Sequence, residues 1–356
     1  MHKKYMVIFL LFLSFTCLSG CWDNKDINHR VMPVVLGIGS TEDGYKVFME
    51  IPVPKEDSLE IRIVSGVGET INQVMDELSK NIESSVDLLH VKVIVISSDL
   101  AEDGVKDLFA GFMRSRDVSP KALVAISEDS LDELFSVLEQ SKESDSTILL
   151  DCFEKHAGWG PQIALTRIWQ VYRSIHSYTL DVAIPLIKMG GTTLIEQSGS
   201  AVIKNGKMVG KISSDETLLY NAFQGESTHG KIEVMKEASV IIVANSMHHE
   251  SDMNHDVPHL KSNIHMKVML LETRGDPSLS KIKKDLEAQL NERFERMFSS
   301  VQSTQADIFG IGQLFRKEIP RKYLKDWRSR YYPNMKMDMN VHVEIQNNGN
   351  LKTPAN

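Results

Sequence analysis

Apolar and polar positions in the first half of the chain follow two alternating patterns. Almost continuous apolar runs at 91–97 and 121–127 are typical of strands buried on both faces of a sheet. Residues 31–40 and 45–53 predict a strand hairpin that turns at Glu42-Asp43-Gly44. Elsewhere apolar residues recur every three or four positions, which predicts helices at about 71–82, 105–113, 131–138 and 161–178. This order favours βαβ units in a mixed or partly parallel sheet.

The second half begins with a different pattern. Asn205-Gly206 lies between apolar segments at 199–204 and 207–212, and this dipeptide is a strong hairpin signal because both residues tolerate positive φ. Two further strands are predicted at 238–245 and 264–272, on either side of a polar loop that carries histidines. Strict alternation of apolar and polar residues over about 335–346 predicts a final strand with one face in water.

Several helix starts are marked by residues that can cap free backbone N–H groups. Asp276 followed by Pro277 predicts the start of a long helix at about 277–303, with an apolar stripe that begins at Leu279. A serine or threonine followed three residues later by glutamate or glutamine predicts a capping box at Thr70 with Gln73, Ser130 with Glu133, and Ser213 with Glu216.

These patterns together predict a mixed α/β (α+β) protein. We expect two or three consecutive domains of mixed sheets with flanking helices, preceded by a cleaved N-terminal signal peptide. The pattern changes near 188–198, which divides the chain into a signal peptide at 1–20, one or more mixed α/β domains at 21–190, and a C-terminal α/β domain at 191–350.

The N-terminus has the features of a lipoprotein leader. Lys3 and Lys4 precede an apolar stretch at 5–18, and this stretch of about 14 residues is short for a hydrocarbon core of ~30 Å. Ser19 and Gly20 are small, which suits a lipoprotein signal peptidase that cuts between Gly20 and Cys21. The thiol of Cys21 would then carry a diacylglyceryl group. The alternative is an ordinary signal peptide or an uncleaved anchor with an incidental cysteine.

Two acyl chains suffice for stable anchoring, and no second apolar run reaches 18 residues. We therefore expect a mature protein that is held at the outer face of a membrane and does not cross it.

Of the three cysteines, Cys17 lies in the leader and Cys21 is acylated, which leaves Cys152 without an internal disulfide partner. Cys152 is interpreted as a buried small apolar residue.

The charge of the chain limits its partners. The formal net charge is −8, and removal of Lys3 and Lys4 with the leader makes it −10. Nucleic acids and anionic lipid head groups are polyanions, so neither is expected to be the main partner.

The motifs of the sequence predict no catalytic residue, no metal site and no cofactor. Five histidines lie within 18 residues and could supply zinc or copper ligands, but they match no helical HExxH pattern and are interpreted as part of a solvated loop: His248, His249, His255, His259 and His265. Gly310-Ile311-Gly312 lacks the rest of a phosphate-binding motif and is interpreted as a tight bend. The sequence contains no Gly-x-Ser-x-Gly motif.

Several segments, taken in order along almost the whole chain, resemble the Ger(x)C family, the lipoprotein C subunits of spore germinant receptors. The segments are Gly20-Cys21-Trp22-Asp23, Leu36-Gly37-Ile38-Gly39, 89–96, 199–204 with 207–210, 213–219, the Asp-x-x-Gly-x-Gly pattern from Asp307 to Gly312, Trp327, and the strand with Val341 and Val343. Departures from the family pattern are modest and include Lys25-Asp26, Ser200 and Ile203.

The resemblance implies a non-enzymatic subunit on the outer surface of the spore inner membrane. It would assemble with the membrane A and B subunits of a receptor that small nutrients trigger, and its fold would be several mixed α/β domains in a row. Only Cys21 corresponds to a functional position of the family. The alternatives are a lipoprotein solute-binding component of a transporter, which predicts two similar lobes, and an envelope hydrolase, which requires a nucleophile or a carboxylate pair.

Overall fold

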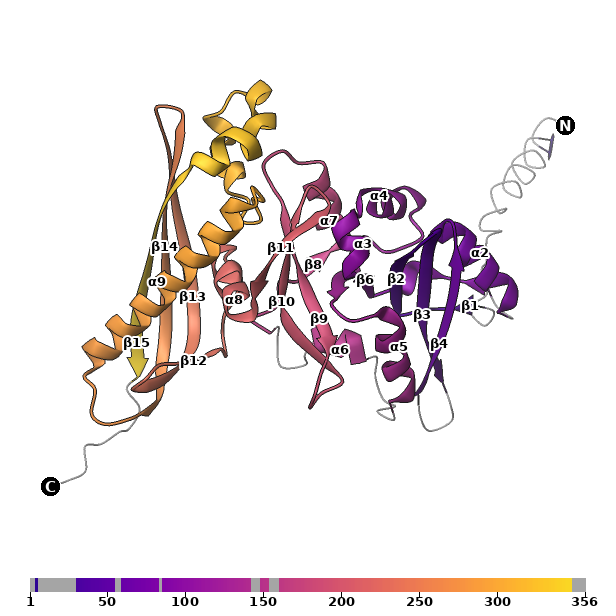
Figure 1. Ribbon diagram of the computed structural model, residues 1–356, viewed down its shortest axis with the longest axis horizontal. Coiled ribbons are helices and arrows are strands. Elements are labelled where there is room, and N and C mark those ends of the chain that lie inside the picture. Colours follow the sequence, from indigo (N-terminus) through magenta and orange to yellow (C-terminus); the bar gives the residue numbers. More distant parts are fainter. Residues whose placement is uncertain are drawn as a thin grey trace.

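The computed structural model describes residues 4–5, 30–54, 59–82, 85–141, 148–153 and 160–347. They form an elongated molecule with a large sheet towards the N-terminal end and a second sheet at the C-terminal end (Figure 1). Gly20 and Cys21, the predicted cleavage and acylation positions, lie outside the described residues. Within the described ranges, no helix combines the length and the apolar character needed to cross a bilayer.

The large sheet joins strands from both halves of the chain. Among the described residues it has nine strands, in the order β11-β10-β9-β7-β6-β2-β3-β4, with the short β8 paired to β7. The strands are β2 (Val35–Thr41), β3 (Gly44–Pro54), β4 (Leu59–Gly68), β6 (Val93–Ser97), β7 (Leu123–Ser127), β8 (Thr166–Arg167), β9 (Val182–Met189), β10 (Ile195–Lys204) and β11 (Lys207–Ser213). A separate parallel pair is formed by β1 (Arg30–Val31) and β5 (Ser85–Val86).

The predicted mixed, partly parallel sheet is confirmed. Strands β2, β6, β7 and β9 run parallel to one another. On one side β3 pairs antiparallel with β2 and β4 with β3, and on the other side β10 pairs antiparallel with β9 and β11 with β10. The central strands β6 and β7 are buried almost throughout, as expected for apolar strands covered on both faces.

Two layers of helices cover the large sheet. On one face, α2 (Ile71–Asn81), α3 (Ser98–Asp103), α4 (Lys106–Ser115) and α7 (Ile168–Ile175) share an apolar core with the strands. On the other face, α5 (Leu131–Gln140) and α6 (Ile148–Phe153) enclose a second core. The sheet is therefore the middle layer of three.

The sheet continues through the region where the sequence pattern changes. β9 and β10 pair from Ile203 with Val182 to Ile195 with Met189, so strands from both sides of 188–198 share one sheet. The β10–β11 hairpin turns at Asn205 and Gly206, whose φ angles are 50° and 79°, as predicted. The proposed division at 190/191 stays a prediction.

The second sheet has the order β12-β13-β14-β15 and packs against one long helix. Its described strands are β12 (Ile232–Val234), β13 (Ala238–Asn254), β14 (Val257–Thr273) and β15 (Lys336–Asn347). β14 pairs antiparallel with β13 and parallel with β15. Helix α9 (Leu279–Ser303) covers one face, and α8 (Ser214–Phe223) packs between the two sheets within one continuous apolar core (Figure 1).

Side chains of α9 also cover the free edge of the second sheet. The backbone N–H of Val341 in β15 donates to Oδ1 of Asn291 at 3.0 Å, and that of Val343 donates to Oε1 of Glu287 at 2.9 Å. Two edge donors that would otherwise face outward are thus occupied. At the opposite edge, both nitrogens of the Arg293 fork donate to the carboxylate of Glu233 in β12 at 3.0 Å.

The predicted polar loop with histidines was wrong. Residues 246–263 continue β13 and β14 as a long hairpin whose turn is His255-Asp256, both with positive φ. Successive side chains there point alternately to the α9 side and to the open face, as in any strand. Because polar residues occur on both faces, the sequence does not show the alternation of apolar and polar residues that marks a strand. The histidines therefore lie on strands and at a strand turn.

Several predicted helix starts also need correction. Ser278, not Asp276, caps α9, because its hydroxyl accepts the N–H of Lys281 at 3.3 Å. Ser130 makes no side-chain cap, whereas Ser213 and Glu216 form the predicted box. Leu279 is 42% exposed at the first turn, outside the buried stripe of α9.

The predicted helix at 161–178 is shorter than expected. Only Ile168–Ile175 is α-helical, because Thr166 and Arg167 pair with β7 as β8. The hydroxyl of Thr166 donates to the carbonyl of Ala183 at 2.6 Å, which fixes this extended entry.

The β10–β11 turn provides a test of local packing. A Cβ atom on Gly206 would lie 2.8 Å from Cγ of Lys106, whereas Gly225 has nearly the same φ of 77° and open space around it. Gly225→Ala should lower the free energy of unfolding by about 1 kcal/mol through positive φ alone. Gly206→Ala should lower it further, by about 2 kcal/mol. Equal losses in urea unfolding would show that the turn is not closely packed.

Candidate functional site

A buried aspartate joins the two sheets. Asp181 lies directly before β9 and is fully buried. Its Oδ1 accepts the backbone N–H of Asn205 in the β10–β11 turn at 2.8 Å, and its Oδ2 accepts the N–H of Asp307 at 3.0 Å. The N–H of Asp181 in turn donates to the carbonyl of Asp307 at 2.8 Å. One side chain therefore links the large sheet to the segment that follows α9.

Arg328 compensates the charge of Asp181. Its Nε donates to Oδ2 and its Nη2 to Oδ1, both at 2.8 Å, and Nη2 also donates to the carbonyl of Leu180 at 3.0 Å. Arg328 lies in the π-helical turn η5 (Trp327–Tyr331), and its side chain is 15% exposed. A two-pronged guanidinium–carboxylate contact of this kind is strong and directional.

A second buried aspartate organises the Asp-x-x-Gly-x-Gly segment. Oδ1 of Asp307 accepts the N–H of Ile311 at 2.9 Å, and Oδ2 accepts the N–H of Gly312 at 2.7 Å and the indole N–H of Trp327 at 2.9 Å. Gly310 has a φ of 68°, which gives the predicted bend before η3 (Ile311–Lys317). A Cβ on Gly312 would lie 2.6 Å from the Trp327 ring. The glycines thus permit the backbone to wrap the carboxylate.

The two aspartates serve a structural purpose. Burial raises the pKa of Asp307 to about 7, while its N–H donors oppose that rise. Every oxygen of both carboxylates already accepts at least one hydrogen bond. The arrangement can hold segments together but offers no free base or nucleophile. Sequence reasoning recognised Asp307 and Trp327 and missed Asp181 and Arg328, because neither of them belongs to a local motif.

A concave surface of about 380 Å³ lies beside this network. It is lined by α7, α8 and the segments next to them, including Trp169 and Arg173, whose guanidinium lies 5.2 Å from the indole ring. Asn221 donates to the carbonyls of Pro161 and Ile163, so its amide stabilises the wall. The groove is amphipathic and exposed, a character that suits protein contacts as well as small molecules.

The structure disperses the histidines that the sequence brought together. His249 points towards the core, where Nδ1 lies 2.9 Å from the Ser262 hydroxyl and burial lowers its pKa. His248, His259 and His265 occupy the other face of the hairpin. Across the described ranges, no group of three metal-ligating side chains could hold a metal ion.

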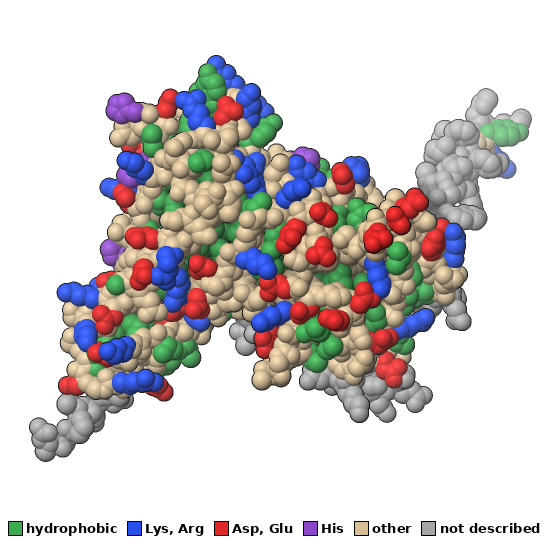
Figure 2. Space-filling view, viewed as in Figure 1, with side chains coloured by type: hydrophobic (Ala, Val, Ile, Leu, Met, Phe, Trp, Pro, Cys, Tyr) green, Lys and Arg blue, Asp and Glu red, His purple; other side chains and the backbone are tan. Residues whose placement is uncertain are grey.

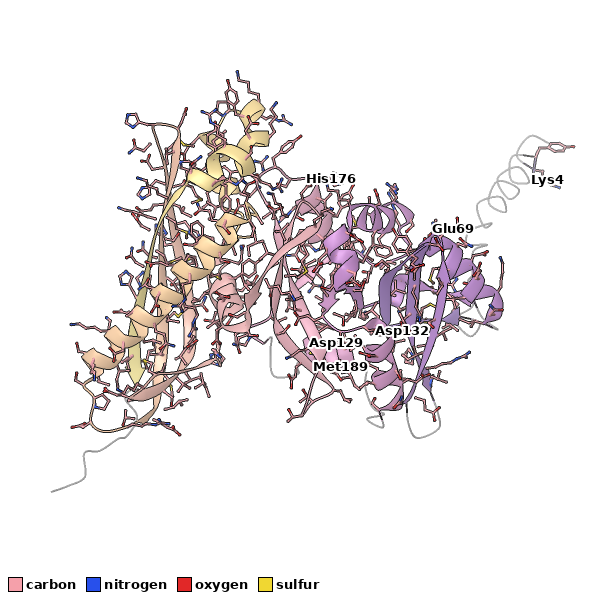
Figure 3. All side chains as sticks on the ribbon, in the orientation of Figure 1. Lys4, Glu69, Asp129, Asp132, His176 and Met189 are labelled. Atoms are coloured by element: carbon pink, nitrogen blue, oxygen red, sulfur yellow. The ribbon has the colours of Figure 1, made fainter. Side chains whose placement is uncertain are left out.

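Cys152 differs in part from its predicted environment. It is partly buried in α6, and Nε2 of Gln197 donates to its sulfur at 3.3 Å. Met189 of the neighbouring β9 is held by Oδ2 of Asp129, which accepts its N–H at 2.6 Å (Figure 3). Cys152 therefore packs against the apolar core of this face as predicted, but it is only half-buried and its sulfur also accepts a hydrogen bond.

A separate buried carboxyl lies in the large sheet. Glu50 of β3 is fully buried, and neither of its side-chain oxygens has a hydrogen-bond partner among the described residues. Its neighbours across the strands are Val35 and Ile63. Burial raises the pKa of Glu50 to about 7, because the charged form loses its hydration without gaining a partner.

The ion pair at the junction should be required for stability. Arg328→Met would leave Asp181 buried without its cation and should lower the free energy of unfolding by about 3–5 kcal/mol. Arg330→Met is the matched control, because the Arg330–Asp256 pair is exposed and should contribute less than about 1 kcal/mol. Chemical denaturation measures both, and a similar small loss in each variant would contradict the assigned role of Arg328.

Glu50 should make stability depend on pH. Since its folded pKa of about 7 exceeds its usual value of 4.5, the unfolded chain releases this proton first as pH rises. Wild-type stability should therefore fall between about pH 4.5 and pH 7 and then level off. Relative to Glu50→Gln, the wild type should lose about 2.5 kcal/mol between pH 5 and pH 8. This difference isolates Glu50 from Asp307, and a gap that stays constant with pH would exclude the effect.

Comparison with known proteins gives a consistent result over the whole chain. Residues 23–189 match the family model described as "Spore germination protein N-terminal domain", and residues 198–349 match "Spore germination B3/ GerAC like, C-terminal". The chain is 19% identical to spore germination protein KC of Bacillus subtilis (strain 168), with 99% of this chain and 98% of that protein covered. It is 23% identical to the putative spore germination protein YfkR of the same organism, with 96% and 95% covered.

A solved structure shows the same fold. The crystal structure of the GerBC protein superposes with a TM-score of 0.59 at 16% identity, covering 88% of this chain and 97% of that one. The two family models adjoin each other, the relatives match over almost their full length, and the fold is shared. These findings agree with the family resemblance that the sequence segments indicated. The chain belongs to the GerAC-like, or Ger(x)C, family of spore germination proteins.

Proposed function

We propose that this protein is the lipid-anchored C subunit of a nutrient germinant receptor, and that it assembles with the membrane A and B subunits without catalysing a reaction. The observation that carries the proposal is the match of both family models, which together extend from residue 23 to residue 349. Directly before that match stands Ser19-Gly20-Cys21, the sequence expected of an acylated lipoprotein.

The proposed anchor restricts where the folded part can lie. Cys21 and Arg30 are nine residues apart in sequence, and a fully extended chain of that length spans about 30 Å. The N-terminal end of the large sheet would then stay close to the outer face of the spore inner membrane. The second sheet lies at the other end of the elongated molecule (Figure 1).

Such a molecule can act through its surfaces. Acidic and basic side chains are interspersed on the face shown in Figure 2, with the second sheet and its helix projecting at one end. Anchoring raises the effective concentration of these surfaces near membrane partners. If the A and B subunits bind this protein more tightly in one state, it biases their equilibrium between resting and triggered forms.

The alternative of a solute-binding component of a transporter is less favoured. That class of protein would have two similar lobes on either side of a ligand cleft. Here the described part of the chain has one large mixed sheet in three layers and one four-stranded sheet with a helix on a single face. The two halves differ in strand number and in topology.

Cys21→Ala should release the protein from the membrane and impair nutrient-triggered germination. The variant keeps its apolar leader but lacks the thiol that accepts lipid, so it should be absent from spore membranes washed with high salt. Cys17→Ala is the matched control, because this cysteine lies in the leader and should not affect anchoring. Membrane fractionation with immunoblotting measures both. Wild-type protein whose N-terminus is unacylated, or whose leader is intact, by mass spectrometry would contradict the anchor.

Assembly requires its own experiment. Affinity purification of the wild-type protein from detergent-solubilised spore membranes should recover two membrane proteins, encoded beside its gene. The Cys21→Ala variant should recover less of both, since it would no longer be concentrated at the bilayer. Recovery of an ABC transporter ATPase and permease in their place would overturn the receptor assignment and support the transporter alternative.

A further inference from the structure

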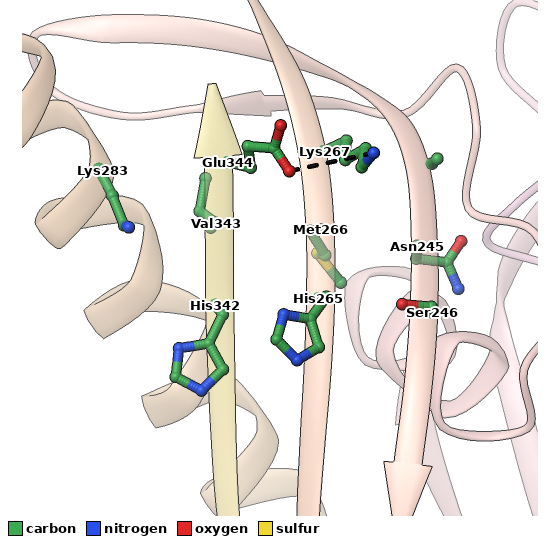
Figure 4. A pocket seen from close by; sticks show the side chains of 10 residues that line it. Asn245, Ser246, His265, Met266, Lys267, Lys283, His342, Val343 and Glu344 are labelled. Carbon is green, nitrogen blue, oxygen red and sulfur yellow. Dashed lines mark ion pairs between the residues drawn. The ribbon is translucent and has the colours of Figure 1, made fainter. Parts of the chain in front are cut away.

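Two histidines from distant parts of the chain meet on the open face of the second sheet. His265 of β14 and His342 of β15 are direct partners in the parallel register. Their ring centroids are 5.0 Å apart and the ring planes differ by 25° (Figure 4). The two residues are 77 positions apart in sequence, so spacing along the chain gives no indication of the pair.

Both rings are free to bind a ligand. Neither His265 nor His342 has a hydrogen bond or an ion pair with any residue in the described ranges, and both are exposed. Other histidines of this hairpin are engaged: His249 with Ser262, and His259 with the carboxylate of Asp338 at 2.9 Å. The pair is therefore distinguished by unused nitrogen atoms as well as by proximity.

The surroundings of the pair form a shallow concavity of about 550 Å³. Glu344 projects from β15 two residues beyond His342 and on the same face, and its carboxylate lies 4.0 Å from the Lys267 ammonium. This ion pair is long and exposed, so its contribution is small and Glu344 can exchange partners. The Glu344 carboxylate is directed towards Lys267 and not towards the two imidazoles, so the histidine nitrogens are the protein ligands that this face offers (Figure 4).

We propose that His265 and His342 form a two-histidine site for a divalent transition-metal ion such as zinc or copper. Imidazole nitrogen is a favoured ligand of these ions, whereas calcium and magnesium prefer oxygen ligands. A tetrahedral zinc ion needs four ligands. Two protein nitrogens leave positions for water or for a side chain of a second molecule docked on this face.

Charge limits the affinity of the site. Lys267 and Lys283 line the same concavity, and their ammonium groups repel a bound cation. Lys267→Gln removes one of these positive charges, so this variant should bind zinc several times more tightly than the wild type. Weaker binding by Lys267→Gln would overturn the proposed geometry.

The decisive experiment counts imidazole ligands. Full-length protein without a histidine tag, kept in detergent, is titrated with copper(II), and electron paramagnetic resonance records coupling to ligand nitrogens. The wild type should show one copper site coordinated by two imidazoles. His265→Asn and His342→Asn should each lack that two-imidazole signal, while His248→Asn, an exposed histidine two residue pairs away along the sheet, should retain it.

Zinc binding gives an independent measurement by calorimetry. Loss of either histidine should weaken zinc binding by more than the ~10–100-fold that follows loss of an outer-shell partner. Excess magnesium or calcium should leave the site unaffected. The proposal fails if His265→Asn and His342→Asn bind zinc as the wild type does, or if calcium competes with zinc. All three substituted histidines are exposed, so circular dichroism should show unchanged folding.

Discussion

The relative arrangement of the two sheets depends on the contact between Asp181 and Arg328. A carboxylate with no exposed surface carries a large desolvation cost, and at Asp181 a guanidinium in two-pronged contact offsets much of it. Because Asp181 also accepts N–H groups from the β10–β11 turn and from Asp307, the charge can be satisfied in only one arrangement of three chain segments. The apolar core around α8 supplies most of the buried surface, and the ion pair specifies its geometry.

This organisation suits a protein that works by presenting surfaces. Asp307 and its glycines hold the chain after α9 against the Trp327 ring, so η3 and η5 are fixed to the same centre as the large sheet. A partner bound to the second sheet would thereby meet a body whose position relative to the N-terminal end is defined. In a tethered subunit, such rigidity transmits a contact at one end to an orientation at the other, without any bond being made or broken.

Much of the fold could be predicted from local patterns, and the errors have identifiable causes. The buried strands β6 and β7, the Asn205-Gly206 turn and the alternation in β15 are determined by neighbouring residues, and all three were predicted correctly. The bases of β13 and β14 were predicted, but the outer part of their hairpin at 246–263 was missed because both of its faces carry polar residues, which hides period two. Asp181 with Arg328, and His265 with His342, depend on long-range pairing that a single sequence does not reveal. Cys21, the predicted acylation position, lies outside the described residues, so only the sequence indicates its role.

The capped edge of β15 would affect self-association if a lipid held the protein at a membrane surface, as proposed. Asn291 and Glu287 occupy the N–H groups of Val341 and Val343, so the middle of this border is interrupted as a template for another strand. Molecules confined to two dimensions by a lipid would collide often and in similar orientations. A sheet that ended in an open strand there would be prone to chain-by-chain polymerisation, and two side chains of α9 oppose that outcome.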